Sequence, residues 1–480
     1  MHERIKIGKG LDIPLKGAAE ARCTDMRHIT LYGIQPSDYV GLAPRLEVRE
    51  GDRVEAGQTV VSDKNNPKIR LTSPVCGTVK EVRRGERRVL DAVVIEKEGE
   101  QRHWRCDAGK LHTRQGLTEA MTECGLWAML KQRPFGVIAN PDDSPRDIFV
   151  SLTDTAPLAP DLWCLTDGRE RQSRLIDNLD ILIARGLDAL ALLTEGTVHV
   201  CGTQTMVRRQ WGCGSRVVFH EIAGPHPSGN VGTQIAAIAP INKGERVWTM
   251  NAQDVATLGH LVETGEYRPE RLVAVTGPAA AYPQYYRITA GASVRELLAG
   301  QVPDEHYPRA TEGNTGDNRT RIISGNVLSG HKVGMDGFVG AYDSQLTLIE
   351  EGDRYTFMGW LMPGVERHSF SRTFVSGILE SCKRIIPGKP FWNWHFDTNK
   401  HGGERPLVFS GDFERVFPFD IYPTQLIKAA IIGDIELMEE LGIYEVEPED
   451  FALCEYIDPS KTEIQSIIRN ALERCRKEAL

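Results

Sequence analysis

The sequence predicts an α+β protein of several domains, and three observations lead to this class. Short apolar runs, alternating with polar residues and broken by Gly, Pro and Asn, fill the first 100 residues and are typical of short strands. Helical and strand-like patterns then alternate from His112 to Gln253, which favours an α/β layer with a largely parallel sheet. Amphipathic helical patterns close the chain. At roughly 150 residues per domain, the 480 residues suggest three or four domains.

Composition and charge exclude several classes of protein. A net charge of -9 speaks against a nucleic-acid partner, because such proteins usually present a basic face. No apolar run reaches the roughly 18 residues needed to cross a bilayer, and the N-terminus has no signal-peptide core, so we expect no transmembrane segment. None of the 10 cysteines forms a C-x-x-C motif, which indicates reduced thiols rather than a disulfide framework.

Residues 1–100 are predicted to form a small barrel of short strands. Gly51 to Gln58 reads G-D-x-V-x-x-G-Q, and Ser73 to Val79 reads S-P-x-x-G-x-V. This pattern resembles the biotinyl/lipoyl domain, a β barrel-sandwich whose hairpin tip carries a modified lysine. Here the tip contains Lys64 without the Met-Lys-Met setting of those domains. The fold is therefore expected without the group that it usually carries.

Residues 110–255 are predicted to form a Rossmann-like α/β domain, after a boundary in the polar stretch 98–110. The expected helices and strands are helix Leu117 to Lys131, strand Arg146 to Leu152, a weaker strand Leu162 to Leu165, helix Ser173 to Arg185, and strands Thr197 to Cys201 and Arg216 to His220.

Residues 260–335 are predicted to form a β-grasp, SLBB-like module, in which two strands precede a short helix capped by Ser293 and Glu296. Thr311 to Arg319 should be an exposed loop. Residues 336–480 are expected to be mixed and then helical. The patterns there are strands Tyr355 to Met362 and Ser369 to Val375, then helices Pro423 to Leu441 and Lys461 to Lys477.

The residues alone define no catalytic centre. Gly224 to Gly232, GPHPSGNVG, is spaced like a phosphate loop but lacks the Lys and Ser/Thr of a nucleotide-binding motif, so a tight turn entering a helix is expected. A metal at His220, Glu221 and His226 is the alternative to loop histidines held by hydrogen bonds, which we favour. Phe391 to Phe396 is aromatic and is expected to be core or interface. No catalytic residues and no metal ligands are therefore assigned.

Several stretches in the same order along the chain resemble one family, the A subunits of the Na+-translocating NADH:quinone reductases. They are Ile5 to Pro14, Val54 to Pro74 with SDKNNP, Arg133 to Leu158, His226 to Ile235, Arg321 to Gly330, Phe357 to Gly364, and Phe417 to Glu463 with DIYPTQLIKAAIIGD, ALCEY and PSKTE. Matches over nearly the whole chain are far more specific than any single motif.

The resemblance extends to the NADH-binding subunit of complex I and the C subunit of Rnf complexes, which carry FMN, NADH and an iron-sulfur cluster. Where those relatives have a glycine-rich loop, this chain reads RPFGVIANP from Arg133 to Pro141. At the cluster position it keeps Cys454 alone, with Asp458 nearby, and one thiol cannot hold a cubane cluster. The resemblance therefore implies no tightly bound cofactor here, with flavins and iron-sulfur centres on partner subunits.

The function that the resemblance implies is that of a peripheral subunit on the cytoplasmic side of the bacterial inner membrane. It would belong to a six-subunit pump that oxidises NADH, reduces ubiquinone and exports Na+. Arg133, Phe135 and His226, at the mouth of the vacated flavin pocket, are our candidates for binding a quinone headgroup. The alternative is a non-catalytic structural docking subunit of the same complex.

Two other functions stay open at this point. A biotin- or lipoyl-dependent transferase would carry its group on Lys64 or Lys68, and a free-standing NAD or flavin oxidoreductase would need the glycine loop that is missing. For the acidic tract Glu445 to Asp450, EVEPED, an exposed turn is expected, and for the apolar stripe from Ile464 to Cys475 an intramolecular core.

Overall fold

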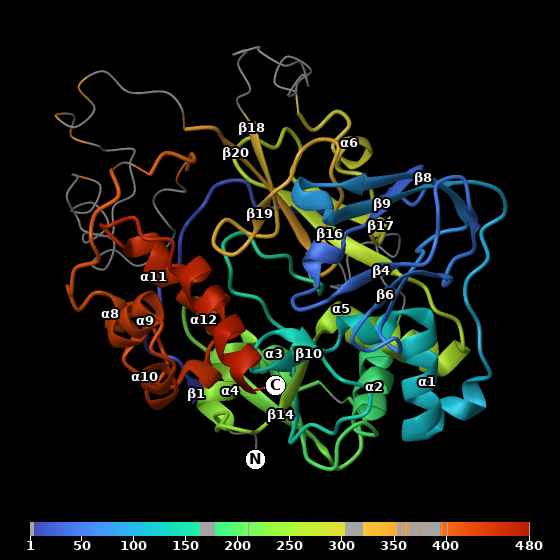
Figure 1. Cartoon of the computed structure of the whole chain (residues 1–480), viewed down its shortest axis with the longest axis horizontal. Helices are drawn as coiled ribbons and strands as arrows, with labels where there is room; N and C mark the ends of the chain where they lie inside the picture. Colours follow the sequence, from blue (N-terminus) through green and yellow to red (C-terminus); the bar gives the residue numbers. More distant parts are fainter. Residues whose placement is uncertain are drawn as a thin grey trace.

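The computed structural model describes residues 4–163, 178–209, 211–302, 320–352 and 402–479, together with residues 358, 361, 363, 375, 394 and 396–400. In Figure 1 the N-terminal strands, in blue, lie beside the strands of the third domain, and the C-terminal helices, in red, lie beside strand β10 (Lys131–Arg133) of the α/β domain. The α+β multidomain class predicted from the sequence is confirmed.

Two small antiparallel sheets form the N-terminal barrel, with strand orders β3-β9-β8-β5 and β4-β6-β7. Its core contains the fully buried side chains of Tyr32, Val60, Val93 and Ile95. The strands are β3 (Leu31–Ile34), β4 (Pro44–Leu46), β5 (Arg53–Val54), β6 (Thr59–Asp63), β7 (Arg70–Thr72), β8 (Gly77–Arg84) and β9 (Leu90–Lys97).

The α/β domain is built on a seven-stranded sheet of order β1-β14-β13-β12-β15-β10-β11. The five strands from β1 to β15 in this order run parallel, and β10 and β11 add an antiparallel edge. The elements are β1 (Arg4–Lys6), α1 (Arg114–Cys124), β10 (Lys131–Arg133), β11 (Val137–Ile138), β12 (Ile148–Ser151), α2 (Leu179–Leu190), β13 (Val198–Gly202), α3 (Gln204–Val207), β14 (Val217–Ala223), α4 (Val231–Ile238), β15 (Val247–Asn251) and α5 (Ala252–Thr264).

The predicted helix Leu117 to Lys131 is shorter than expected. Helix α1 ends at Gly125, whose φ of 84° is left-handed and stops the α-helix. A 3₁₀ turn, Leu126–Met129, follows, and Lys131 then opens strand β10. Lys131 is therefore a strand residue and not the last residue of a helix.

A six-stranded sheet of order β19-β18-β20-β16-β17-β2 forms the third domain. Ser293 precedes the short helix as predicted, but its side chain makes no capping bond, and the Glu296 carboxylate instead accepts the Thr30 N–H at 2.8 Å. The elements are β2 (Glu20–Asp25), β16 (Glu270–Thr276), β17 (Gln284–Thr289), α6 (Val294–Leu297), β18 (Thr320–Ser324), β19 (His331–Lys332) and β20 (Gln345–Glu350).

The C-terminal region packs its helices around a second apolar core. The predicted helix Pro423 to Leu441 is in fact two helices, because Gly433 ends the first at a φ of 76° and the Asp434 carboxylate caps the second. The helical elements are α8 (Phe413–Val416), α9 (Pro423–Ile432), α10 (Ile435–Glu440), η6 (Ile443–Glu445), η7 (Pro448–Phe451), α11 (Ala452–Ile457) and α12 (Ile464–Ala479). The apolar stripe of α12 is buried in this core, as expected.

The first 25 residues do not belong to the barrel sheets. Strand β1 pairs with β14 of the α/β sheet, and β2 pairs with β17 of the third-domain sheet. The N-terminal segment therefore links the α/β domain and the third domain.

The predicted domain ranges 1–100, 110–255, 260–335 and 336–480 stay predictions. The patterns that lie wholly or largely outside the described residues are Leu162 to Leu165, the first half of Ser173 to Arg185, Thr311 to Arg319, Tyr355 to Met362, Ser369 to Val375 and Phe391 to Phe396.

Within the ranges that the structure describes, no helix is both long and apolar enough to cross a membrane.

Candidate functional site

A cavity of about 1540 Å³ lies where the α/β domain, the third domain and the C-terminal helices meet. Its wall includes Lys131 and Arg133 of β10, the start of α4 at Asn230 and Val231, and residues of η7 and α12. A large cavity between domains with a few convergent polar groups is the usual form of a small-molecule site. We call it the interdomain cavity.

Arg133 lies on the wall of the interdomain cavity, but carboxylates already hold its guanidinium. The side chain is only 6% exposed, Nη1 lies 3.2 Å from Asp450 Oδ2, and Nη2 pairs with Glu449. Glycine at position 232 allows this approach, because a Cβ there would lie 2.5 Å from Arg133 Nη1. The predicted quinone contact is therefore also an anchor for η7.

Phe135 does not line the interdomain cavity. Its backbone is left-handed, with a φ of 87°, and its ring meets Tyr444 edge to face at a centroid distance of 5.9 Å. Its carbonyl oxygen accepts an N–H from Arg469 Nη1 at 2.9 Å. The structure therefore places Phe135 in the packing of the C-terminal helices, next to the cavity residues Arg133 and Gly136.

His226 lies on the cavity wall with 3% of its surface exposed. Its Nδ1 lies 3.2 Å from Thr155 Oγ1, and its backbone N–H donates to Asp12 Oδ1 at 2.9 Å. Burial lowers the pKa of the imidazole to about 4, so the ring is neutral at neutral pH. The glycine turn enters α4 as predicted, and His226 is a hydrogen-bonded loop histidine.

The acidic tract Glu445 to Asp450 is not the exposed turn that its composition suggests. Glu447 and Asp450 are 4% and 2% exposed, and each caps the backbone of the other around η7. Arg469 Nη2 lies 3.2 Å from Glu447 Oε2. Burial raises the pKa of Asp450 to about 7 even though Arg133 lowers it. The prediction of an exposed turn is wrong because distant arginines pair with these acids.

Lys131 projects into the interdomain cavity from the first position of β10. Its Nζ lies 3.5 Å from the centroid of the Tyr342 ring. Burial lowers the pKa of this ammonium, and the nearby carboxylates Glu449, Glu447 and Asp343 partly offset the effect. An aromatic face stabilises a cation but accepts no full hydrogen bond, so the N–H groups remain available to a ligand.

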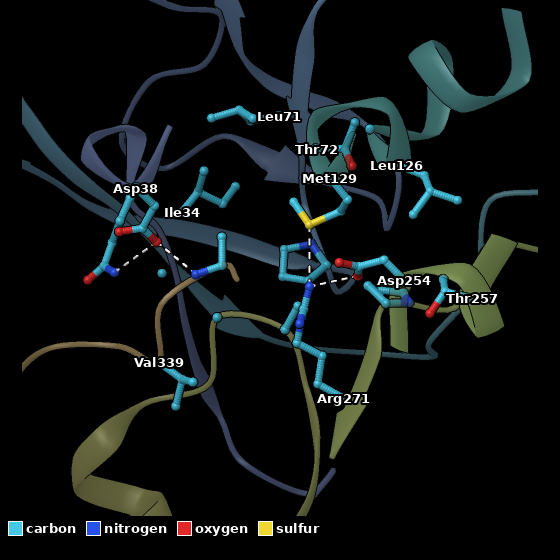
Figure 2. Close-up of a pocket in the computed structure, with 18 of the residues that line it drawn as sticks. Ile34, Asp38, Leu71, Thr72, Leu126, Met129, Asp254, Thr257, Arg271 and Val339 are labelled. Atoms are coloured by element: carbon cyan, nitrogen blue, oxygen red, sulfur yellow. Dashed lines mark hydrogen bonds and ion pairs between the residues drawn. The ribbon is translucent and has the colours of Figure 1, made fainter. Parts of the chain in front are cut away.

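A smaller pocket of about 80 Å³ adjoins the interdomain cavity and shares Asp38, Met129 and Arg271 with it. Figure 2 shows Arg271 reaching between Asp254 and Met129, and its Nη2 donates to Asp254 Oδ1 at 2.7 Å. Both side chains of this ion pair are almost fully buried. The Asp254 carboxylate therefore neutralises Arg271 at the wall between the two spaces.

The barrel hairpin that would carry a prosthetic group contacts the α/β domain. Asn66 Nδ2 donates to Asn140 Oδ1 at 3.0 Å, and Lys68 Nζ lies 2.5 Å from an Asp142 carboxylate oxygen. Lys64 is exposed beside these contacts. The tip therefore serves as a contact between the barrel and its neighbour.

Two other candidates from the sequence are placed by the structure as well. Cys454 is fully buried in α11, and burial raises the pKa of its thiol. His220 Nε2 lies 2.9 Å from His199 Nδ1 on the neighbouring strand, and so does not share a site with His226. In the described part of the chain, no three His, Cys, Asp or Glu side chains are grouped as metal ligands would be.

The sequence did not indicate Lys131, Tyr342, Glu447 or Glu449 as cavity residues. A helical pattern ran through Lys131, and composition alone suggested that EVEPED is exposed. The available signal was Gly125, which ends the helix six residues before Lys131.

Comparisons with known proteins agree with this domain order. Residues 5–98 match the model of the NqrA N-terminal barrel-sandwich hybrid domain, residues 112–267 that of the NqrA second alpha/beta domain, and residues 272–309 that of the NQRA C-terminal domain. The A subunit of the Na(+)-translocating NADH-quinone reductase of Yersinia pestis is 36% identical over 484 residues, covering 99% of this chain and 100% of the relative. Its counterpart in Pseudomonas aeruginosa PAO1 is 37% identical over 481 residues, with the same coverage of both chains. The chain therefore belongs to the NqrA family, the A subunits of the Na(+)-translocating NADH-quinone reductases.

Proposed function

We propose that this chain is a peripheral subunit of a sodium-pumping NADH:ubiquinone reductase and that it binds quinone in the interdomain cavity. The single observation that carries the proposal is the cavity itself, which has Arg133 and His226 on its wall. Its volume of about 1540 Å³ leaves room for a ring and part of an isoprenoid tail. Relatives named as subunits of a quinone reductase make quinone the ligand to test first.

The complex would oxidise NADH, reduce ubiquinone and export Na+, and this chain would lie on the cytoplasmic side of the inner membrane. Five other subunits would complete it and hold its flavins and iron-sulfur centres. The loop from Arg133 to Pro141 supports this division, because Arg133 is fixed to Glu449 and Asp450 where close approach of a pyrophosphate would be needed.

Titration of the purified full chain with a short-chain ubiquinone tests the proposal. We expect saturable binding, and Arg133→Ala combined with Phe135→Ala should weaken it by removing a cavity cation and the packing beside it. Glu449→Gln with Asp450→Asn is the matched control. It removes the two ion pairs that hold η7 to Arg133 but keeps the Arg133 guanidinium in the cavity wall. Unchanged affinity in the first variant would reject Arg133 as a quinone contact and would reject a supporting role for the packing of Phe135 beside it.

The second candidate is a structural docking subunit that never meets quinone. The ion pairs of Arg133 favour it, since they show that this residue has a role in joining domains. This alternative predicts copurification with membrane subunits of the complex and no quinone binding, with or without those partners. Binding of quinone to the isolated chain would exclude it.

A further inference from the structure

One cation on the wall of the interdomain cavity differs in its charge environment from the others described there. Of the described residues, six lysine and arginine side chains line the cavity, and five of them are paired with a carboxylate. These pairs are Arg133 with Asp450, Arg209 with Asp180, Arg271 with Asp254, Lys332 with Glu351, and Arg469 with Glu447. Among the ion pairs of the described residues, none includes Lys131. Lys131 is therefore a cavity cation whose N–H groups are not already used by a described acid.

The position of Lys131 is fixed from two sides. Its backbone lies between Ile138 of β11 and Thr249 of β15 in the antiparallel edge of the sheet. Its Nζ lies 3.5 Å from the centroid of the Tyr342 ring, and the Tyr342 hydroxyl donates to the Ala128 carbonyl oxygen at 2.7 Å. An ammonium on a fixed aromatic platform loses little freedom when it donates to a ligand.

We propose that Lys131 is the residue that positions the quinone, by donating a hydrogen bond from its ammonium to one carbonyl oxygen of the ring. This inference rests on the proposed quinone-binding function. A quinone carbonyl is an acceptor without charge, and it gains most from a charged donor that no carboxylate occupies. Arg133, which the sequence suggested for this role, is held by Glu449 and Asp450.

The surroundings of Lys131 predict a dependence of binding on pH. The charged and titratable groups that face it are Arg133 on β10, Asp254 on α5, Tyr342 and Asp343 before β20, and Glu447 and Glu449 at η7. Burial lowers the pKa of Lys131, so its charge is lost at a lower pH than that of an exposed lysine. Quinone affinity should therefore fall as pH rises through this lowered pKa.

The test is a calorimetric titration of the full chain with a short-chain ubiquinone between about pH 6 and pH 10, spanning the range below the usual lysine pKa. Lys131→Met keeps the apolar stem and removes the charge, and should raise the dissociation constant about 10- to 100-fold at the low end of this range. Lys131→Arg keeps a charge at every pH. Its quinone affinity should therefore stay within a few-fold of that of the unaltered chain at low pH and should not fall at high pH. Lys80→Met, on an exposed lysine paired with Glu96, is the matched control.

The outcomes separate this inference from the function on which it rests. Wild-type affinity in Lys131→Met, or the wild-type pH profile in Lys131→Arg, would overturn the role of Lys131 and leave quinone binding intact. Absence of quinone binding by the unaltered chain would overturn both. Urea unfolding of each variant checks that a loss of affinity is not a loss of fold.

Discussion

Replacing Arg133 by Met should loosen the C-terminal helices from the α/β domain. Arg133 lies on β10, and its partner Asp450 lies in η7, with side chains 6% and 0% exposed. At a pH above about 7, where the Asp450 carboxylate is ionised, removing Arg133 leaves a buried charge uncompensated, which typically costs about 3–5 kcal/mol. Glu449 loses the same partner. The contact between β10 and η7 should therefore be the part of the structure that is destabilised most.

Urea unfolding and amide hydrogen exchange measure this effect. The Arg133→Met chain should unfold at lower urea, and amides of η7 and α12 should exchange faster than those of the barrel. Arg133→Met combined with Asp450→Asn should recover most of the loss, because no buried charge is then left alone.

Lys243→Met is the control for an exposed contact between the same two parts of the chain. Lys243 pairs with Glu439 but its side chain is 70% exposed, so its loss should cost about 0–1 kcal/mol. If Arg133→Met also stayed within about 1 kcal/mol of the unaltered chain, the argument from buried charge would be refuted.

Three further predictions concern neighbouring features. Burial raises the pKa of Asp450 to about 7, above the value of about 3.9 in the unfolded chain, so the folded state keeps a proton that the unfolded state releases. The free energy of unfolding should therefore fall as pH rises from about 4 to about 7, and Asp450→Asn should remove this fall. Urea titrations at a series of pH values measure it. The same dependence on pH in the Asp450→Asn chain would contradict the raised pKa of Asp450. Gly232→Ala should cost about 1–3 kcal/mol, since its Cβ would lie 2.5 Å from Arg133 Nη1, whereas Gly214→Ala, with its nearest neighbour at 3.6 Å, should be tolerated. Intact mass spectrometry should show no group attached to Lys64, and Lys64→Arg should leave assembly with partner subunits unchanged. An added mass on Lys64 would instead support the alternative of a biotin- or lipoyl-dependent transferase.

Local patterns predicted those parts of the fold that depend on neighbours in sequence. The turn at Gly51 to Gln58 and the alternating runs around it indicated the barrel, and the stripe from Ile464 to Cys475 indicated the buried face of α12. Both rest on periodicities that local geometry imposes. The strand order of the sheets, and the addition of β1 and β2 to two different sheets, depend on long-range pairing that no local pattern contains.

The candidate site was predicted less well for the same reason. Arg133 and His226 do line the interdomain cavity, but Arg133 pairs with Asp450, which is 317 residues away in sequence. Composition cannot reveal such a partner, so the sequence predicts that EVEPED is exposed and gives no sign that Arg133 forms an ion pair. Lys131 was assigned to a helix end because the pattern continues past Gly125, where the left-handed backbone stops the helix.

The most direct test of the central claim is an experimental structure of the full chain with a short-chain ubiquinone bound. Our account predicts the ring in the interdomain cavity, between β10 and η7, with one carbonyl oxygen about 2.7–3.2 Å from Lys131 Nζ. A ring bound elsewhere on the chain, or an empty cavity at saturating quinone, would contradict it.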